Sequence, residues 1–388
     1  MAITTTDGSK TLYTFLAETT PELVATGAYQ TLRSKTGVKF DLNRETFESK
    51  ERRSDRQVSA LSYGNKSGSA SIPIEWSYGS YDSFMEAVLG GTWTTNVLKI
   101  GNTARTFAVE ETATELGITE QALGVQFSGF SISQKNSGIA EGDFTGVFRS
   151  LRAPQTKGVN IAIDATAKTI TRTGAGFNTI DGFPLVTAGV PVLKVSMKGN
   201  ANAGNNDTVW TVTTLTDTVM TFTTMTGAVT ATAAAGIVVN NASVSSSVVA
   251  ASTLAPFDSF TGTITEGGAV IAHVTGWDLK VDQEVKLNHA NGSDTAQSSS
   301  VGGIKVSGNL SVYYIDQALR KKFVNGTSSS LSLVMGSIAA TKAYTFSLGT
   351  IKYSSNSRDD NELARTETLA FTATYTDTDT ALKITRTP

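Results

Sequence analysis

The chain has 388 residues, with 32 Lys and Arg against 34 Asp and Glu, and it contains no cysteine. A net charge of −2 excludes a globally basic nucleic-acid-binding protein, and the lack of cysteine excludes disulfides, thiolate metal sites and thiol nucleophiles. Charged residues make up only 17% of the chain, and the abundance of Thr and Ser favours strands over helices. We therefore expect a mainly β protein of two or three domains.

Two strands are predicted near the N-terminus, with a charged segment between them. Residues 36–45 and 69–76 alternate polar with apolar side chains, as half-buried strands do. The intervening segment, 43–59, mixes both signs of charge, which suits either a solvated hairpin tip or a surface that meets a charged face of another subunit. Its charged residues are Arg44, Glu45, Glu48, Lys50, Glu51, Arg52, Arg53, Asp55 and Arg56.

A short helix and a strand pair are predicted next. In FMEAVLGG, which starts at Phe84, Phe84 and Val88 have the i, i+4 spacing of one helix face, and we expect a helix over 81–90. The segments 125–133 and 142–148 then alternate as two further strands.

The composition changes in the middle of the chain. Residues 155–250 contain no Glu and are rich in Thr, Ala, Val, Gly and Asn. Thr alternates with apolar residues there, and segments such as 199–207 supply turns, so we expect a small all-β module. Pro-, Ser- and Ala-rich connectors on both sides are typical of domain boundaries.

The two flanks of this module resemble each other. TGVKFDLNRE from Thr36 matches TGWDLKVDQE from Thr275, and SGSASIPIEW from Ser67 matches SGNLSVYYID from Ser307. A helical segment follows each, the second over 316–325, and a strand pair ends each flank, the second at 344–352 and 369–375. We interpret this as a duplication, which predicts a first β domain at 1–154, an inserted β domain at 155–250 and a second copy at 251–388.

Catalytic patterns are scarce. His273 and His289 each stand alone, and no serine lies in a Gly-x-Ser-x-Gly pattern. The Gly-rich segment 174–182 lacks the third Gly, the following helix and the Lys of a phosphate-binding loop. We predict no catalytic residue, no cofactor and no metal, and the protein is not expected to be an enzyme.

The C-terminal part resembles the tail tube proteins of long-tailed bacteriophages of the siphophage type. The resemblance rests on the runs 264–284 and 306–335 and on the strand from Tyr344, and it extends weakly to the first copy. It implies β-sandwich or half-barrel domains, each with one short helix. It also implies a virion protein whose sheets close around an axis into rings that stack as the hollow tube through which DNA is delivered.

The resemblance carries expectations about partners. The chain's partners would be copies of itself, the tape-measure protein, transiting double-stranded DNA, the tail terminator and the distal tail proteins. Assembly would take place in the host cytoplasm, without membrane insertion, and the inserted domain would sit outside the tube, where it can contact the host surface. The segment 43–59 would reach the neighbouring ring, and the two helices would lie outside the barrel or simply cover their own sheets.

Duplication affects the ring count, because three chains with two domains each fill six positions. The alternative is a ring of six chains. A lumen of weak or negative potential would let DNA pass. The candidate lumen-facing residues lie on polar strand faces: Lys39, Asp41, Ser69, Ser71 and Glu75 in the first copy, and Asp278, Lys280, Asp282, Asn309 and Ser311 in the second.

Two other classes fit the composition. A surface adhesin or pilus-like protein is also Thr-rich and cysteine-poor, but it should carry a secretion signal, and none is evident. A β-sandwich enzyme acting on polysaccharide would need two converging carboxylates, and no spacing in the sequence identifies such a pair.

Overall fold

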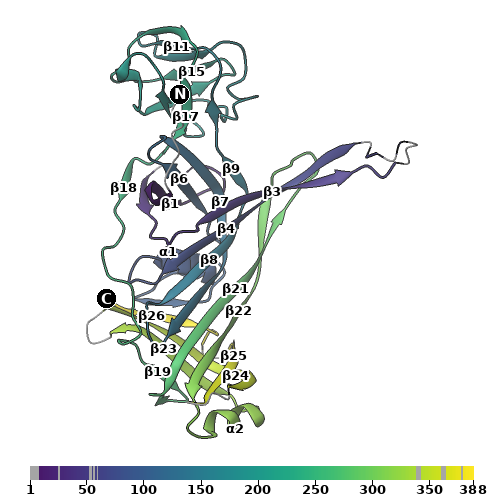
Figure 1. The fold of residues 1–388 in the computed structure, drawn as a ribbon, viewed down its shortest axis with the longest axis vertical. Coiled ribbons are helices and arrows are strands. Elements are labelled where there is room, and N and C mark those ends of the chain that lie inside the picture. Colours follow the sequence, from purple (N-terminus) through teal and green to yellow (C-terminus); the bar gives the residue numbers. More distant parts are fainter. Residues whose placement is uncertain are drawn as a thin grey trace.

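The computed structural model describes residues 8–24, 27–51, 55, 57–58, 60–337, 342–359, 364–376 and 379–388. These residues form a mainly β structure with two sheets, one of 18 strands and one of eight. In Figure 1 the smaller sheet lies at one end of the molecule, the C-terminal strands lie at the other end, and a long hairpin projects sideways between them.

The N-terminal unit supplies about half of the large sheet. Its strands alternate buried and exposed residues along most of their length, which places one face on the core and the other in solvent. Its elements are η1 (Gly8–Lys10), β1 (Thr11–Ala17), β2 (Ala28–Thr31), β3 (Lys39–Glu48), β4 (Leu61–Glu75), α1 (Asp82–Leu89), β5 (Val97–Lys99), β6 (Phe107–Ala113), β7 (Ile118–Lys135), β8 (Glu141–Phe148) and β9 (Ser150–Arg152).

The C-terminal unit supplies the rest of the large sheet. It follows a connecting strand, β18 (Ser247–Val249), which pairs in parallel with β2. Its elements are β19 (Ile264–Glu266), β20 (Ala269–Val270), β21 (Val274–Asn288), β22 (Ser298–Tyr313), α2 (Ala318–Val324), β23 (Ser329–Ser337), β24 (Lys342–Asp359), β25 (Thr366–Thr374) and β26 (Lys383–Thr387).

The two units pair their strands in the same order. The N-terminal unit runs β3–β4–β8–β7–β6–β1, and the C-terminal unit runs β21–β22–β25–β24–β23–β19. In both units the short helix follows the second strand of this order, and a last strand, β9 or β26, returns to pair with β7 or β24. The likeness between the flanks is therefore a likeness of topology.

The Ser-Gly motif has the same structural role in both units. Gly68 pairs with Phe148, and Gly308 pairs with Phe371. A Cβ atom on Gly68 would lie 2.4 Å from the Phe148 ring, and one on Gly308 would lie 2.7 Å from the Phe371 ring. Each glycine therefore makes room for an aromatic ring of the next strand.

The same register corrects one detail of the sequence comparison. Gly68 faces Leu42 on its other side, and Gly308 faces Leu279, so Asp41 corresponds to Asp278. Matching the Thr-Gly pairs at 36–37 and 275–276 was therefore wrong by two residues. The first pair precedes β3, whereas the second lies inside β21.

The middle unit has a sheet and a core of its own. Its strands pair in the order β10–β17–β13–β14–β15–β12–β11–β16, and its core includes Trp210, Phe177 and Phe183. Its elements are β10 (Gln155–Thr156), β11 (Ile161–Asp164), β12 (Thr169–Arg172), β13 (Lys194–Lys198), η2 (Ala203–Asn205), β14 (Trp210–Leu215), β15 (Val219–Phe222), β16 (Ala231–Ala234) and β17 (Val238–Ala242).

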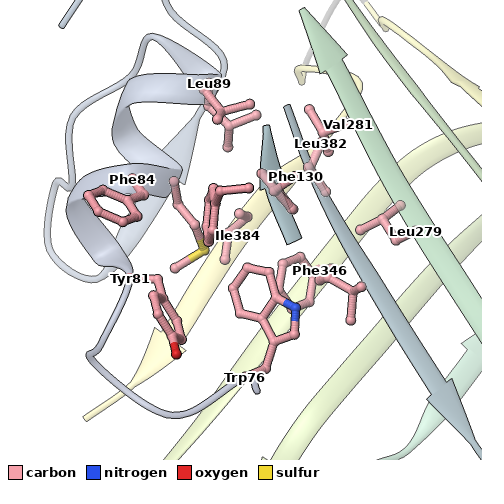
Figure 2. Packing of buried hydrophobic residues seen from close by; sticks show 14 of the residues in the cluster. Trp76, Tyr81, Phe84, Leu89, Phe130, Leu279, Val281, Phe346, Leu382 and Ile384 are labelled. Atoms are coloured by element: carbon pink, nitrogen blue, oxygen red, sulfur yellow. The ribbon is translucent and has the colours of Figure 1, made fainter. Parts of the chain in front are cut away.

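The N-terminal and C-terminal units share a single hydrophobic core. Figure 2 shows Trp76 of the N-terminal unit beside Phe346, Leu279 and Ile384 of the C-terminal unit, whereas the ring of Phe84, which belongs to the same core, points away from them. All five side chains are at most 1% exposed, and each contributes about 1.5–3 kcal/mol relative to an exposed position. The core therefore joins the two units into one body.

Candidate assembly surfaces

The junction between the two units is a strand pairing. The last part of β7, from Gly129 to Lys135, pairs antiparallel with Gly276–Asp282 of β21. This pairing continues the sheet from one unit into the next, and helix α1 lies against both strands. In α1 the inward side chains, among them Phe84 and Val88, are completely buried.

Polar contacts reinforce this junction. Asp82, at the start of α1, accepts hydrogen bonds from the Tyr344 hydroxyl and from the Arg386 guanidinium. Lys99 of β5 lies 2.9 Å from Asp379, which also binds Lys383 at 2.7 Å. Because of these two lysines, the pKa of Asp379 falls from its ordinary value near 3.8 to about 2.

The equivalent edges at the two ends of the combined sheet are open. Within the described residues, β3, the counterpart of β21, pairs with β4 alone. Among the same residues, the part of β24 beyond Ile351, which corresponds to the end of β7, pairs on one side with β25. Open edges present unpaired N–H and C=O groups, and another chain can pair with them.

The side chains next to these open edges are also uncovered. Leu42 on β3 is 40% exposed, whereas its counterpart Leu279 is completely buried. Helix α2 has no buried residue among its seven, and Val324 is 68% exposed. Among the described residues, α2 packs on β24 as α1 packs on β7, but it has no counterpart of the contact between α1 and β21.

One face of the large sheet carries a row of polar residues across the junction between the two units. A row of directly opposed residues crosses both units: Glu75 faces Glu141, Glu141 faces Ser133, Ser133 faces Asp278, and Asp278 faces Asn309. Opposed residues of paired strands lie on the same face of a sheet. This face is opposite the core, because the neighbouring residues along each strand are the buried ones.

The ten residues predicted to face the lumen lie on this polar face. Lys39 faces Ser71, Asp41 faces Ser69, and Lys280 and Asp282 follow Asp278 at alternate positions of β21. Several of these side chains are held by their neighbours. The Asn309 side-chain amide donates to the Asp278 carboxylate at 3.0 and 3.1 Å, and the Lys280 ammonium lies 2.9 Å from the Asp282 carboxylate. The hydroxyls of Ser311 and Thr368 lie 2.9 Å apart. The set of ten contains two lysines and four carboxylates.

The charged segment 43–59 is largely strand rather than loop at its start. Arg44, Glu45 and Glu48 lie on β3, because the β3–β4 pairing extends outward to Glu48 and Leu61. We call the described residues of 44–66 the arm; Figure 1 shows it projecting away from the rest of the sheet. Lys50, Glu51 and Asp55 lie in the connection at its tip, and Arg52, Arg53 and Arg56 lie outside the described residues.

The arm carries apolar as well as charged side chains. Phe47, Leu61 and Tyr63 are each more than half exposed. The Arg44 guanidinium lies 4.4 Å from the centre of the Tyr63 ring. Phe47 pairs with Ser62, so it lies on the opposite face of the arm from Leu61 and Tyr63.

A family model of phage tail tube proteins matches residues 8–382, almost the whole chain. The chain belongs to the phage tail tube protein family. Among curated proteins, none matches the sequence. Family membership makes this chain a structural component of the virion tail.

The described residues contain no group of three or more His, Asp or Glu arranged to hold a metal ion. His273 lies just before β21 and His289 just beyond its end, so the two histidines flank opposite ends of the strand. No described helix has the length and apolarity needed to cross a membrane.

The middle unit of the tube protein is docked by buried polar contacts that sequence patterns did not reveal. Glu110 of β6 is fully buried and accepts hydrogen bonds from Gln121, from the Ser243 hydroxyl and from the Val244 amide. Asn241 of β17 donates to the Thr119 carbonyl at 2.9 Å. Glu110 lies in an ordinary strand sequence, so only the fold identifies its role.

Proposed function

We propose that the chain assembles with copies of itself into closed rings that stack into the tail tube and deliver DNA to the host. The observation that carries this proposal is the repeated strand order, in which one junction is made inside the chain while the equivalent edges stay open. By the same geometry, β3 of one chain pairs with β24 of the next beyond Ile351. The role is structural and not enzymatic.

The proposed ring contains three chains, because each chain supplies two units and six positions close the ring. In this arrangement Leu42 becomes buried as Leu279 is, and α2 is covered as α1 is. The domains would be 1–154 and 251–388 in the tube wall and 155–250 outside it. A ring of six chains is the alternative.

The polar face is proposed to line the lumen. Its carboxylates outnumber its lysines among the ten candidates, and Lys280 is already paired with a carboxylate. DNA phosphates bind where unpaired Lys and Arg gather, so this face should let the double strand slide past. The arm would then reach the next ring with its charged and apolar side chains.

The remaining partners follow from the position of a tube in a tail. The tape-measure protein would occupy the lumen before DNA, and the terminator and distal tail proteins would cap the two ends. The middle unit would project outward, where it can contact the host surface. Assembly in the host cytoplasm completes the proposal.

The test is a change at the open edge. Leu42→Asp should leave a folded single chain that no longer forms rings, because a buried charge would oppose the neighbouring contact. Leu254→Asp is the matched control, since Leu254 is 39% exposed and lies on the connector. Negative-stain microscopy scores rings and tubes, and native mass spectrometry counts chains per ring. If Leu42→Asp assembled as efficiently as the control, the proposed interface would be wrong. If each ring contained six chains, the proposed number of chains per ring would be wrong.

A further inference from the structure

The β21–β22 hairpin ends against the arm of the same chain. We call residues 283–304 the second hairpin. Figure 1 shows the arm swinging away from the sheet, with the second hairpin reaching it part-way along. The two hairpins are topological counterparts, yet they take different directions.

The contact is made by Asp294 at the tip of the second hairpin. Its carbonyl accepts a hydrogen bond of 2.7 Å from the backbone amide of Lys66. Its carboxylate lies 2.7 Å from the Lys66 ammonium and 3.4 Å from the Arg44 guanidinium. Lys66 holds the pKa of Asp294 below its usual range, chiefly through their hydrogen bond, so the carboxylate is charged at neutral pH.

The contact falls where the arm changes its register. Arg44 faces Lys66 directly, and the next paired residues are Thr46 and Tyr63, so a β-bulge separates the two pairs. Bulges bend a strand and increase its twist. Asp294 therefore binds both residues of the last regular pair before the bend.

The arm has little support of its own beyond this point. It continues as two strands, and a two-stranded ribbon alone is marginally stable in water. The second hairpin, by contrast, is tied down. Ser299 accepts a hydrogen bond of 3.0 Å from Arg149 of the N-terminal unit. Within the hairpin, Gln297 donates its backbone amide to the Asn288 carbonyl and closes the turn, and Ala296 is only 1% exposed.

We propose that the second hairpin is a prop that fixes the direction of the arm, with Asp294 as the positioning residue. This inference rests on the proposed function, in which the arm contacts a second copy of the chain in the next ring. It follows that the two hairpins of a chain have different tasks: one reaches outward, and the other sets its angle. Each chain then contacts the next ring through one arm rather than through two.

Spin labels can test the prop without any assembly. The natural chain has no cysteine, so Ser62→Cys on the arm and Ser133→Cys on β7 give one labelled pair. We expect a single narrow distance distribution in the parent chain and a broadened one in Asp294→Ala. Asp294→Glu, which keeps the carboxylate, should restore much of the narrow distribution. Glu115→Ala is the matched control, because it removes another half-exposed ion pair, that with Lys10, far from the arm.

Assembly provides the second readout. Asp294→Ala should still form rings, but long tubes should be lost because the arms no longer point at the next ring. An unchanged distance distribution in Asp294→Ala would overturn the prop, and so would equal broadening in Glu115→Ala. If the parent chain formed no rings, the proposed function would fail, while the spin-label distances would still decide whether Asp294 holds the arm.

Discussion

Gly68 and Gly308 show how a single residue type fixes the pairing of a whole strand. Each lies opposite a phenylalanine whose ring occupies the space above the glycine Cα. Any side chain would displace that ring or the neighbouring backbone. A slip of the strand by one residue would place a serine or an asparagine against the ring instead, so the Gly–Phe pair also selects the register.

Gly308→Ala should destabilise the chain by about 1–3 kcal/mol, the usual cost of overpacking a filled core. Its Cβ would lie 2.1 Å from the Asp278 carbonyl oxygen. Gly303→Ala on the same strand is the control, since nothing lies within 4 Å of a Cβ there, and its effect should stay within about 0.5 kcal/mol. Urea unfolding measures both. Equal stabilities of the two variants would show that the ring does not need the glycine.

At the scale of elements, the junction between the units combines strand pairing with ion pairs. Asp379 links β5 of the N-terminal unit to β26 of the C-terminal unit through Lys99 and Lys383. A carboxylate whose pKa is lower in the folded than in the unfolded state stabilises the fold above its unfolded pKa, and this contribution disappears as the pH falls through the folded value. The relevant window is therefore between about pH 4 and pH 2.

Asp379→Asn should lower the melting temperature at neutral pH, and the difference from the natural chain should shrink as the pH falls toward 2, where about half of the natural aspartate is protonated. Lys383→Ala should reduce the same pH dependence, because it removes the first cause of the pKa shift. Thermal unfolding followed by circular dichroism between pH 2 and pH 7 gives the comparison. A melting-temperature difference that persists unchanged at pH 2 would rule out this ion pair as its source.

For the whole molecule, the charge of the polar face should govern DNA passage. Asp282→Lys would place a third lysine beside Lys280 and the opposed Lys305, a cluster that binds phosphate. Particles carrying this variant should assemble normally and eject DNA more slowly, whereas Asp282→Asn, which adds no positive charge, should have a smaller effect. Fluorescence of a DNA-binding dye measures the ejection rate. Equal rates for both variants would count against the polar face as the lumen.

The sequence predicted the mainly β class, the two short helices and the order of the repeated segments, because alternation and i, i+4 spacing reflect local geometry. Long-range contacts were beyond its reach. The pairing of β7 with β21 joins residues more than a hundred positions apart. The sequence of neither strand indicates which strand it pairs with. Asp294 and Glu110 likewise sit in unremarkable local sequences, and only the fold brings their partners to them.

The direct pairing of β7 with β21 also bears on the time before a tube exists. A subunit with a single unit would expose two complementary strand edges for every unit made, and such edges can also pair with an unintended strand. Joining two units through β7 and β21 buries half of these edges within each molecule as it folds. If chains close into rings as proposed, newly made chains would meet their partners with fewer open edges, and fewer encounters would complete each closed layer.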